Sequence, residues 1–145
     1  NFMQKNNYFF TYTNYKTFKI NNPIKKTILA PSKFNFNSFV KNTSIATSTM
    51  IVKRSISLKI KFSNTKICED YYYKCQLLKK IGNAYCYPGF LTEYQIRKDS
   101  LQSNRIRNLY WIWQINKKLN HFHFLKNLIS IFLISFNSLK KYGFK

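Results

Sequence analysis

The chain has 145 residues, which is enough for one ordinary domain but excludes two full ones. Its 25 Lys and Arg residues against 4 Asp and Glu leave a formal net charge of +21, a self-repulsion that a polyanionic partner would relieve. Nucleic acid is the polyanion that this balance indicates first, and an anionic membrane surface is the competitor.

Cysteine content and hydropathy indicate in which compartment the chain resides and whether it crosses a membrane. Three cysteines at irregular spacing argue against a disulfide framework, so we expect a reduced compartment. The most apolar run, 128–136, contains two serines and is far shorter than the roughly 20 residues that span a bilayer. Because the first residue is Asn1 rather than Met, we expect a processed or incompletely traced form.

Residues 1–66 contain no acidic side chain, and most of them follow neither a helical nor a strand period. We interpret them as a long basic extension that lies on a partner, with a disordered tail or a retained targeting segment as the alternative. One stretch, 55–63, alternates apolar and polar residues without error. This alternation predicts a half-buried strand with a basic outer face.

Residues 67–145 predict a helical domain. A helix should begin at Glu69 and end before Gly82, because acidic residues occupy its first turn and lysines its last. A turn over 85–89 and a short helix over 90–98 should follow. Asp99 or Ser100 would then end that helix or cap the next element. The last element, 122–136, should also be helical and end at Asn137-Ser138.

The predicted fold class is therefore mostly α with short β elements, in a small, extended and irregular domain bound to rRNA. The predicted division is a basic, acid-free extension over residues 1–66, with one strand near 55–63, and a helical rRNA-binding domain over residues 67–145.

Nothing in the sequence indicates catalysis. The four carboxylates fall where helix ends account for them, and no Ser, Cys or His lies in a recognisable nucleophile setting. The three glycines match no phosphate-binding loop. The cysteines with His121 and His123 could supply metal ligands, but without a Cys-x-x-Cys pair isolated buried thiols are favoured. We therefore predict no enzyme activity, no cofactor and no metal.

Basic and aromatic residues are interleaved near the C-terminus, a mixture suited to gripping phosphates and stacking on bases. Arginine is scarce in this chain, and two of its four arginines lie two positions apart there. Trp111 and Trp113 are either core or base-stacking residues. The predicted RNA-binding residues are Arg105, Arg107, Asn108, Tyr110, Lys117, Lys118, Lys140 and Lys141.

Arg105-Ile106-Arg107-Asn108 resembles the Arg-hydrophobic-Arg-Asn motif of the fourteenth small-subunit ribosomal protein family, in its long, zinc-free organellar form. Ser100 and Ser103 precede the motif, and 140–144 resembles the family's closing Lys-Lys-Ala/Ser-Ser-Trp. The segment after the motif departs from the family, which has Arg-Cys and then Thr-Gly-Arg there. The resemblance covers about 69–145 and implies a protein of the small-subunit head.

We therefore predict a structural constituent of the mitochondrial ribosome, in the matrix, that stabilises rRNA by phosphate contacts and base stacking. Its expected partners are rRNA and neighbouring proteins of the small-subunit head, with no small-molecule substrate and no membrane span. A plastid is the alternative compartment. The alternative function is an accessory subunit of an organellar inner-membrane respiratory complex. A free sequence-specific regulator is disfavoured, because no helix-turn-helix or RNA-recognition signature is present.

Overall fold

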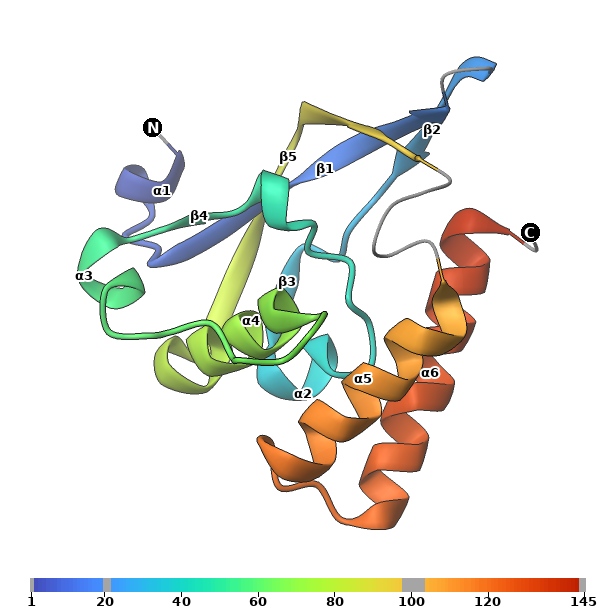
Figure 1. Ribbon diagram of the computed structural model, residues 1–145. Coiled ribbons are helices and arrows are strands. Elements are labelled where there is room, and N and C mark those ends of the chain that lie inside the picture. Colours follow the sequence, from blue (N-terminus) through green and yellow to red (C-terminus); the bar gives the residue numbers. More distant parts are fainter. Residues whose placement is uncertain (1, 20–21, 98–103, 144–145) are drawn as a thin grey trace.

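A computed structural model describes residues 2–19, 22–97 and 104–143 (Figure 1). In chain order the elements are α1 (Phe2–Lys5), β1 (Phe10–Lys19), β2 (Asn22–Ile28), β3 (Lys33–Asn35), α2 (Phe36–Phe39), the 3-10 turn η1 (Thr47–Thr49), β4 (Ile51–Val52), α3 (Arg54–Ser57), α4 (Glu69–Ile81), β5 (Asn83–Gln95), α5 (Arg105–Lys118) and α6 (Phe124–Tyr142).

Five strands form one mixed sheet in the order β2-β1-β5-β3, with the short β4 also paired to β1. β1 runs antiparallel to β2 and β4 but parallel to β5. Helices α2, α4, α5 and α6 supply buried residues to one hydrophobic core. Of these helices, α2 contacts β3, and α4 contacts both β3 and β5. The mixed α/β architecture contradicts the predicted mostly α, irregular rRNA-bound domain.

The central strand β1 lies in the segment predicted to be an extension. Its residues from Phe10 to Tyr15 are all buried, because neighbours pack on both of its faces. Apolar and polar residues alternate only from Phe10 to Thr13, and Asn14-Tyr15 breaks the pattern, so the period-2 signal is too short to predict the strand. Its Phe, Tyr and Thr residues are nevertheless typical strand formers. β1 was therefore detectable from residue preference but not from pattern.

β5 occupies the predicted turn over 85–89 and most of the predicted helix over 90–98, whose last residue lies outside the described residues. Pro88 and Gly89 lie within the strand, where the register against β1 shifts on either side of Asn14. The Asn14 side-chain amide donates to the Pro88 carbonyl at 3.0 Å and so bridges the irregularity. A bulge accommodates a proline that a regular ladder would exclude. The Pro-Gly pair thus marks a bulge rather than a chain reversal.

The strand predicted over 55–63 is also wrong. Residues 54–57 form the single helical turn α3, and no strand follows before α4. Ile56 and Ile60 pack against the core, and the Phe62 ring stacks on Tyr73 of α4 with centroids 4.4 Å apart. The apolar face of this stretch is therefore only partly covered, by α4 and the core rather than by a partner strand, and Leu58 stays exposed.

α4 confirms the best-signalled prediction. It begins after Cys68, which has a left-handed φ of 62°, and ends at Gly82 with φ 79°. That positive φ explains why glycine follows the helix. Tyr71, Leu77 and Leu78 face the core. The acidic first turn and basic last turn lie as predicted from the helix dipole.

α6 confirms the predicted last helix but continues past Asn137. The Asn137 side-chain amide donates to the carbonyls of Leu133 and Lys41, so this residue holds the helix in place instead of ending it. α6 lies beside α5 at the margin of the molecule (Figure 1). The division after residue 66 stays a prediction, although β1 and β5 from its two sides share a sheet. Asp99, Ser100, Ser103 and 144–145 lie outside the described residues.

Candidate active site

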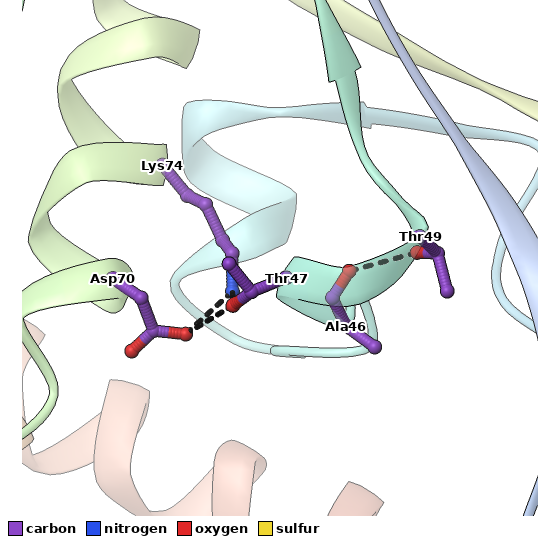
Figure 2. Close-up of polar contacts among 5 residues, drawn as sticks. All are labelled: Ala46, Thr47, Thr49, Asp70 and Lys74. Atoms are coloured by element: carbon purple, nitrogen blue, oxygen red, sulfur yellow. Dashed lines mark hydrogen bonds and ion pairs between the residues drawn. The ribbon is translucent and has the colours of Figure 1, made fainter. Parts of the chain in front are cut away.

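The first turn of α4 holds a compact polar cluster (Figure 2). The Asp70 Oδ2 atom accepts hydrogen bonds from Thr47 Oγ1 at 2.6 Å and from Lys74 Nζ at 2.8 Å. Lys74 Nζ also donates to Thr47 Oγ1 at 2.8 Å, which closes a triangle. The i, i+4 spacing places Lys74 one turn above Asp70 on the same helix face. η1 brings Thr47 to that face, and its turn is held by the bond from Thr49 Oγ1 to the Ala46 carbonyl.

Burial and neighbouring charge shift the pKa of the Asp70 carboxyl in opposite directions. Burial by itself would raise the pKa of the Asp70 carboxyl. The charge of Lys74 and hydrogen bonds from Lys74, Thr47 and the Tyr71 backbone N–H outweigh that effect and lower the pKa below its usual range. The Lys74 side chain is 5% exposed and that of Asp70 is 22% exposed. Asp70 is therefore an ionised carboxylate that solvent can still reach.

The beginnings of α4 and α5 meet beside this cluster. The Cys68 thiol lies 3.9 Å from the carbonyl oxygen of Asn108 in the first turn of α5. Burial, followed by the negative charges of Asp70 and Glu69, raises the pKa of Cys68 to about 12, whereas Lys74 and Arg107 act against that rise. We call this region the α4–α5 corner; it comprises Thr47, Cys68, Glu69, Asp70, Lys74 and Arg107.

The corner combines an ionised carboxylate with cationic side chains. Such a set can accept a proton from a hydroxyl group and can hold an anionic group nearby. Glu93, in β5, differs because it forms a half-exposed ion pair with Lys25 at 2.5 Å. Among the described residues, no three His, Cys, Asp or Glu side chains are grouped closely enough to hold a metal ion.

The two arginines of the sequence motif have different surroundings. Arg105 donates from Nη2 to the Gly143 carbonyl at 3.3 Å and thereby ties the start of α5 to the end of α6. Arg107 is exposed, and its charge acts on Cys68 at the α4–α5 corner. Asn108 follows Arg107, and its backbone carbonyl lies toward the Cys68 thiol. Tyr110 is exposed and meets Trp111 edge-on at 6.0 Å.

The four predicted lysines are divided between the two ends of the α5–α6 hairpin. Lys117 and Lys118 are exposed in the last turn of α5, and Lys140 and Lys141 lie in the last turn of α6. Because the helices run in opposite directions, the two pairs are separated by about 20 Å or more. The structure therefore does not gather the eight predicted residues into one patch.

The tryptophans are both half-buried. Trp111 packs against the hydrophobic core, and Trp113 meets Phe124 edge-on with ring centroids 5.7 Å apart. Trp113 thus adjoins the exposed start of α6, whereas Trp111 faces inward.

Sequence reasoning missed the corner for two reasons. The helix dipole accounts fully for the acidic pair Glu69-Asp70, so the sequence alone gives no sign of a further role for these carboxylates. The spacing of Asp70 and Lys74 was a readable signal for an ion pair. The contribution of Thr47 comes from a segment 23 residues away and had no local signal.

Three curated proteins are similar to this chain along nearly all of its length, and all three are named glycosyltransferases. A putative teichuronic acid biosynthesis glycosyltransferase of Bacillus subtilis is 27% identical over 141 residues, covering 97% of this chain and 56% of that protein. A UDP-Glc:alpha-D-GlcNAc-diphosphoundecaprenol beta-1,3-glucosyltransferase of Escherichia coli is 29% identical, covering 98% and 55%. An uncharacterized glycosyltransferase of Haemophilus influenzae is 24% identical, covering 98% and 57%.

The chain spans about half the length of the curated relatives it matches. No family model matches the chain, and no solved structure matches it.

These similarities overturn the main functional predictions. They point to a glycosyltransferase, not to the fourteenth small-subunit ribosomal protein family, and they give no support to a respiratory-complex subunit. The exclusion of an enzyme and of a small-molecule substrate was wrong, as were the rRNA and ribosomal-protein partners. The mitochondrial or plastid location is corrected too, because these relatives are bacterial. The resemblance at Arg105–Asn108 therefore does not identify the family of this chain.

Proposed function

We propose that this chain takes part in glycosyl transfer from a nucleotide-linked sugar to a hydroxyl group of an acceptor. The observation that carries this proposal is its similarity, over 97% to 98% of its length, to three glycosyltransferases. The name of the Escherichia coli relative specifies a UDP-glucose donor and a lipid-diphosphate-linked sugar acceptor. We adopt the general class of that reaction, a nucleotide-diphosphate sugar with a saccharide acceptor.

The reaction requires a proton acceptor. The acceptor oxygen forms a bond to the anomeric carbon, the bond from that carbon to the donor diphosphate breaks, and the diphosphate leaves with the electron pair. The hydroxyl proton must pass to a base, and a positioned carboxylate is one of the common choices. Asp70 supports this role because it is ionised, reachable from solvent and held in one orientation by Thr47 and Lys74.

Cationic side chains at the α4–α5 corner suit the other reactant. The departing diphosphate gains negative charge as the glycosidic bond breaks, and positive groups already in place stabilise that charge. Arg107 is exposed beside Cys68 and offers a planar set of donors that matches phosphate oxygens. We assign Asp70 as the proton acceptor and Arg107 as a group that binds the diphosphate.

The test measures release of UDP from UDP-sugars, with and without saccharide acceptors, by the full natural polypeptide that contains this chain. We expect Asp70→Asn to lower the rate by about 100-fold or more. Glu93→Gln is the matched control, because Glu93 is a carboxylate of the same chain that pairs with Lys25 on the sheet. We expect the control to retain the rate. Absence of release with every UDP-sugar, or equal losses in the two variants, would contradict the assignment.

A loss of folding must be separated from a loss of chemistry. Asp70→Asn leaves the buried Lys74 without its carboxylate, so the variant Asp70→Asn/Lys74→Met removes both charges together. The double variant should recover the circular dichroism spectrum and unfolding midpoint of the parent but not its rate. Recovery of the rate would exclude Asp70 as the base.

A further inference from the structure

Helix α6 has its polar side chains toward the protein. Asn127 donates to the Trp113 carbonyl at 3.1 Å, and Asn137 donates to the Lys41 carbonyl at 3.0 Å. Between them, Ser130 donates to the Val40 carbonyl at 2.6 Å and accepts from Asn116 at 3.0 Å. Asn127 and Ser130 are buried, as is Ile134 one turn further along. Polar bonds, together with Ile134, thus hold this helix to the domain.

The opposite face of α6 is apolar and points to solvent. Its large side chains recur at the three- and four-residue spacings of one helix face. Each of them is between 49% and 68% exposed. We call this surface the apolar face of α6; it comprises Phe124, Leu125, Leu128, Ile129, Phe132 and Phe136.

This orientation, with polar side chains inward and apolar side chains outward, is the opposite of that expected for a surface helix in water. A helix on the surface of a soluble domain normally turns its apolar side to the core and its polar side to water. Single exposed apolar residues need no explanation, but a contiguous exposed set marks an interaction surface. The polar anchors of α6 keep the apolar face in that outward orientation.

Basic and aromatic residues border the apolar face. Lys117 and Lys118 end α5 near the start of α6, and the exposed Lys140 lies in the last turn of α6. Trp113 contacts Phe124 at the near edge. An apolar stripe with lysines at its ends and a tryptophan at its margin is the pattern of helices that lie in the headgroup region of a bilayer.

Among the described residues, no helix is both long and apolar enough to cross a membrane, so α6 would lie along the surface rather than span it. A second copy of this chain is a poorer occupant, because the contact would bring together two molecules of net charge +21. Anionic lipid headgroups complement that charge. We propose that the apolar face of α6 docks on the surface of an anionic phospholipid bilayer. The inference rests on the geometry of α6 and does not depend on glycosyl transfer.

The test is cosedimentation of the full natural polypeptide with lipid vesicles, which requires no enzymatic activity. Vesicles of phosphatidylglycerol mixed with phosphatidylcholine should bind the protein more tightly than vesicles of phosphatidylcholine alone. The variant Leu128→Gln/Phe132→Gln should weaken binding by at least about tenfold, because each side chain loses its burial in the lipid. Both residues are exposed in the structure, so the variant should fold as the parent does.

The matched control is Leu58→Gln/Leu91→Gln, which removes two comparably exposed leucines, 73% and 71%, from other elements. We expect it to bind vesicles as the parent does. No binding by the parent, or equal weakening in both variants, would overturn the proposal. So would self-association that disappears in Leu128→Gln/Phe132→Gln, because it would assign the apolar face to a second copy.

Tryptophan fluorescence provides an independent measurement. In a variant with Trp111→Phe, and with any tryptophan outside these 145 residues also replaced by Phe, Trp113 is the one remaining tryptophan and reports on the edge of the apolar face. Its emission should shift to shorter wavelength on addition of anionic vesicles and should be quenched by brominated lipid. Unchanged emission in the presence of bound vesicles would place the contact elsewhere and overturn the proposal.

Discussion

Tyr15 and Tyr142 join the middle of the central strand to the last turn of the last helix, with their hydroxyl oxygens 2.8 Å apart. Burial is the first cause that raises the pKa of both hydroxyls, so each stays protonated over the ordinary pH range. The bond connects residues 127 positions apart in the chain. The Tyr15–Tyr142 hydrogen bond therefore reports on whether α6 packs against the sheet.

The variant Tyr142→Phe should lower the free energy of unfolding by about 1 kcal/mol, because the buried Tyr15 hydroxyl loses its partner. Urea denaturation followed by circular dichroism measures the change. Tyr110→Phe is the control, since the Tyr110 side chain is exposed and should change stability by less than about 0.5 kcal/mol. Equal effects would mean that the Tyr15–Tyr142 bond does not form in solution.

Removal of one member of the Asp70–Lys74 pair should be more damaging than removal of both. Lys74→Met leaves the Asp70 carboxylate without its cation, and Asp70→Asn leaves a buried ammonium group; each should cost about 3 kcal/mol. The double variant should lie much closer to the parent, because no uncompensated charge remains. A double-mutant cycle from urea midpoints gives the coupling free energy. Additive losses would contradict the pairing seen in the structure.

Protonation of the Asp70 carboxylate at low pH should lower the free energy of unfolding. Because its pKa is lower in the folded state than in the unfolded state, the unfolded chain binds the proton more readily. The stabilisation is therefore complete above about pH 5 and is lost as the pH falls through the folded pKa. Unfolding midpoints measured across that range should drop for the parent and less steeply for Asp70→Asn/Lys74→Met. Parallel curves for the two proteins would exclude Asp70 as the source.

Ser130 is the central anchor of α6. Ser130→Ala should cost about 2 kcal/mol, because the Val40 carbonyl and the buried Asn116 amide both lose a partner. Ser135→Ala provides a control on the same helix, since within the described part of the chain the Ser135 hydroxyl bonds only to the Ile131 carbonyl one turn earlier. We expect Ser135→Ala to remain within about 0.5 kcal/mol of the parent. Thermal unfolding distinguishes the two, and similar midpoints would rule out the inward anchoring.

Elements with local signals were predictable. α4 carries its charges, its spacing and its terminal Gly82 within a dozen or so residues, and its bounds came out as expected. β1 and β5 depend on each other across some 70 residues, as in the pairing of Thr11 with Tyr85. The alternation of β1 ends at Thr13, and Pro88 with Gly89 makes the sequence of β5 resemble that of a turn. Pairing between strands so far apart in the chain cannot be predicted from a short stretch of sequence.

One part of the candidate site could be predicted from the sequence, and the other part depends on the fold. The pairing of Asp70 with Lys74 follows from helical spacing and was accessible from the sequence. The positions of Thr47 and Arg107 depend on how η1 and α5 pack against α4, which only the fold determines. Its place at the start of a helix accounts for Asp70 but does not exclude a chemical role. A carboxylate can stabilise a helix and serve a reaction at once.

The anchors of α6 have a consequence for how the sequence can evolve. The oxygens that receive its polar side chains at 40, 41 and 113 are main-chain carbonyls, which are present whatever side chain stands at those positions. Val40 itself lies in the core, but at the exposed Lys41 substitutions can accumulate without detaching the helix. The outward face is thus specified by three or four residues of α6 itself, and a lineage could rewrite much of the adjoining surface while keeping the helix in the same orientation.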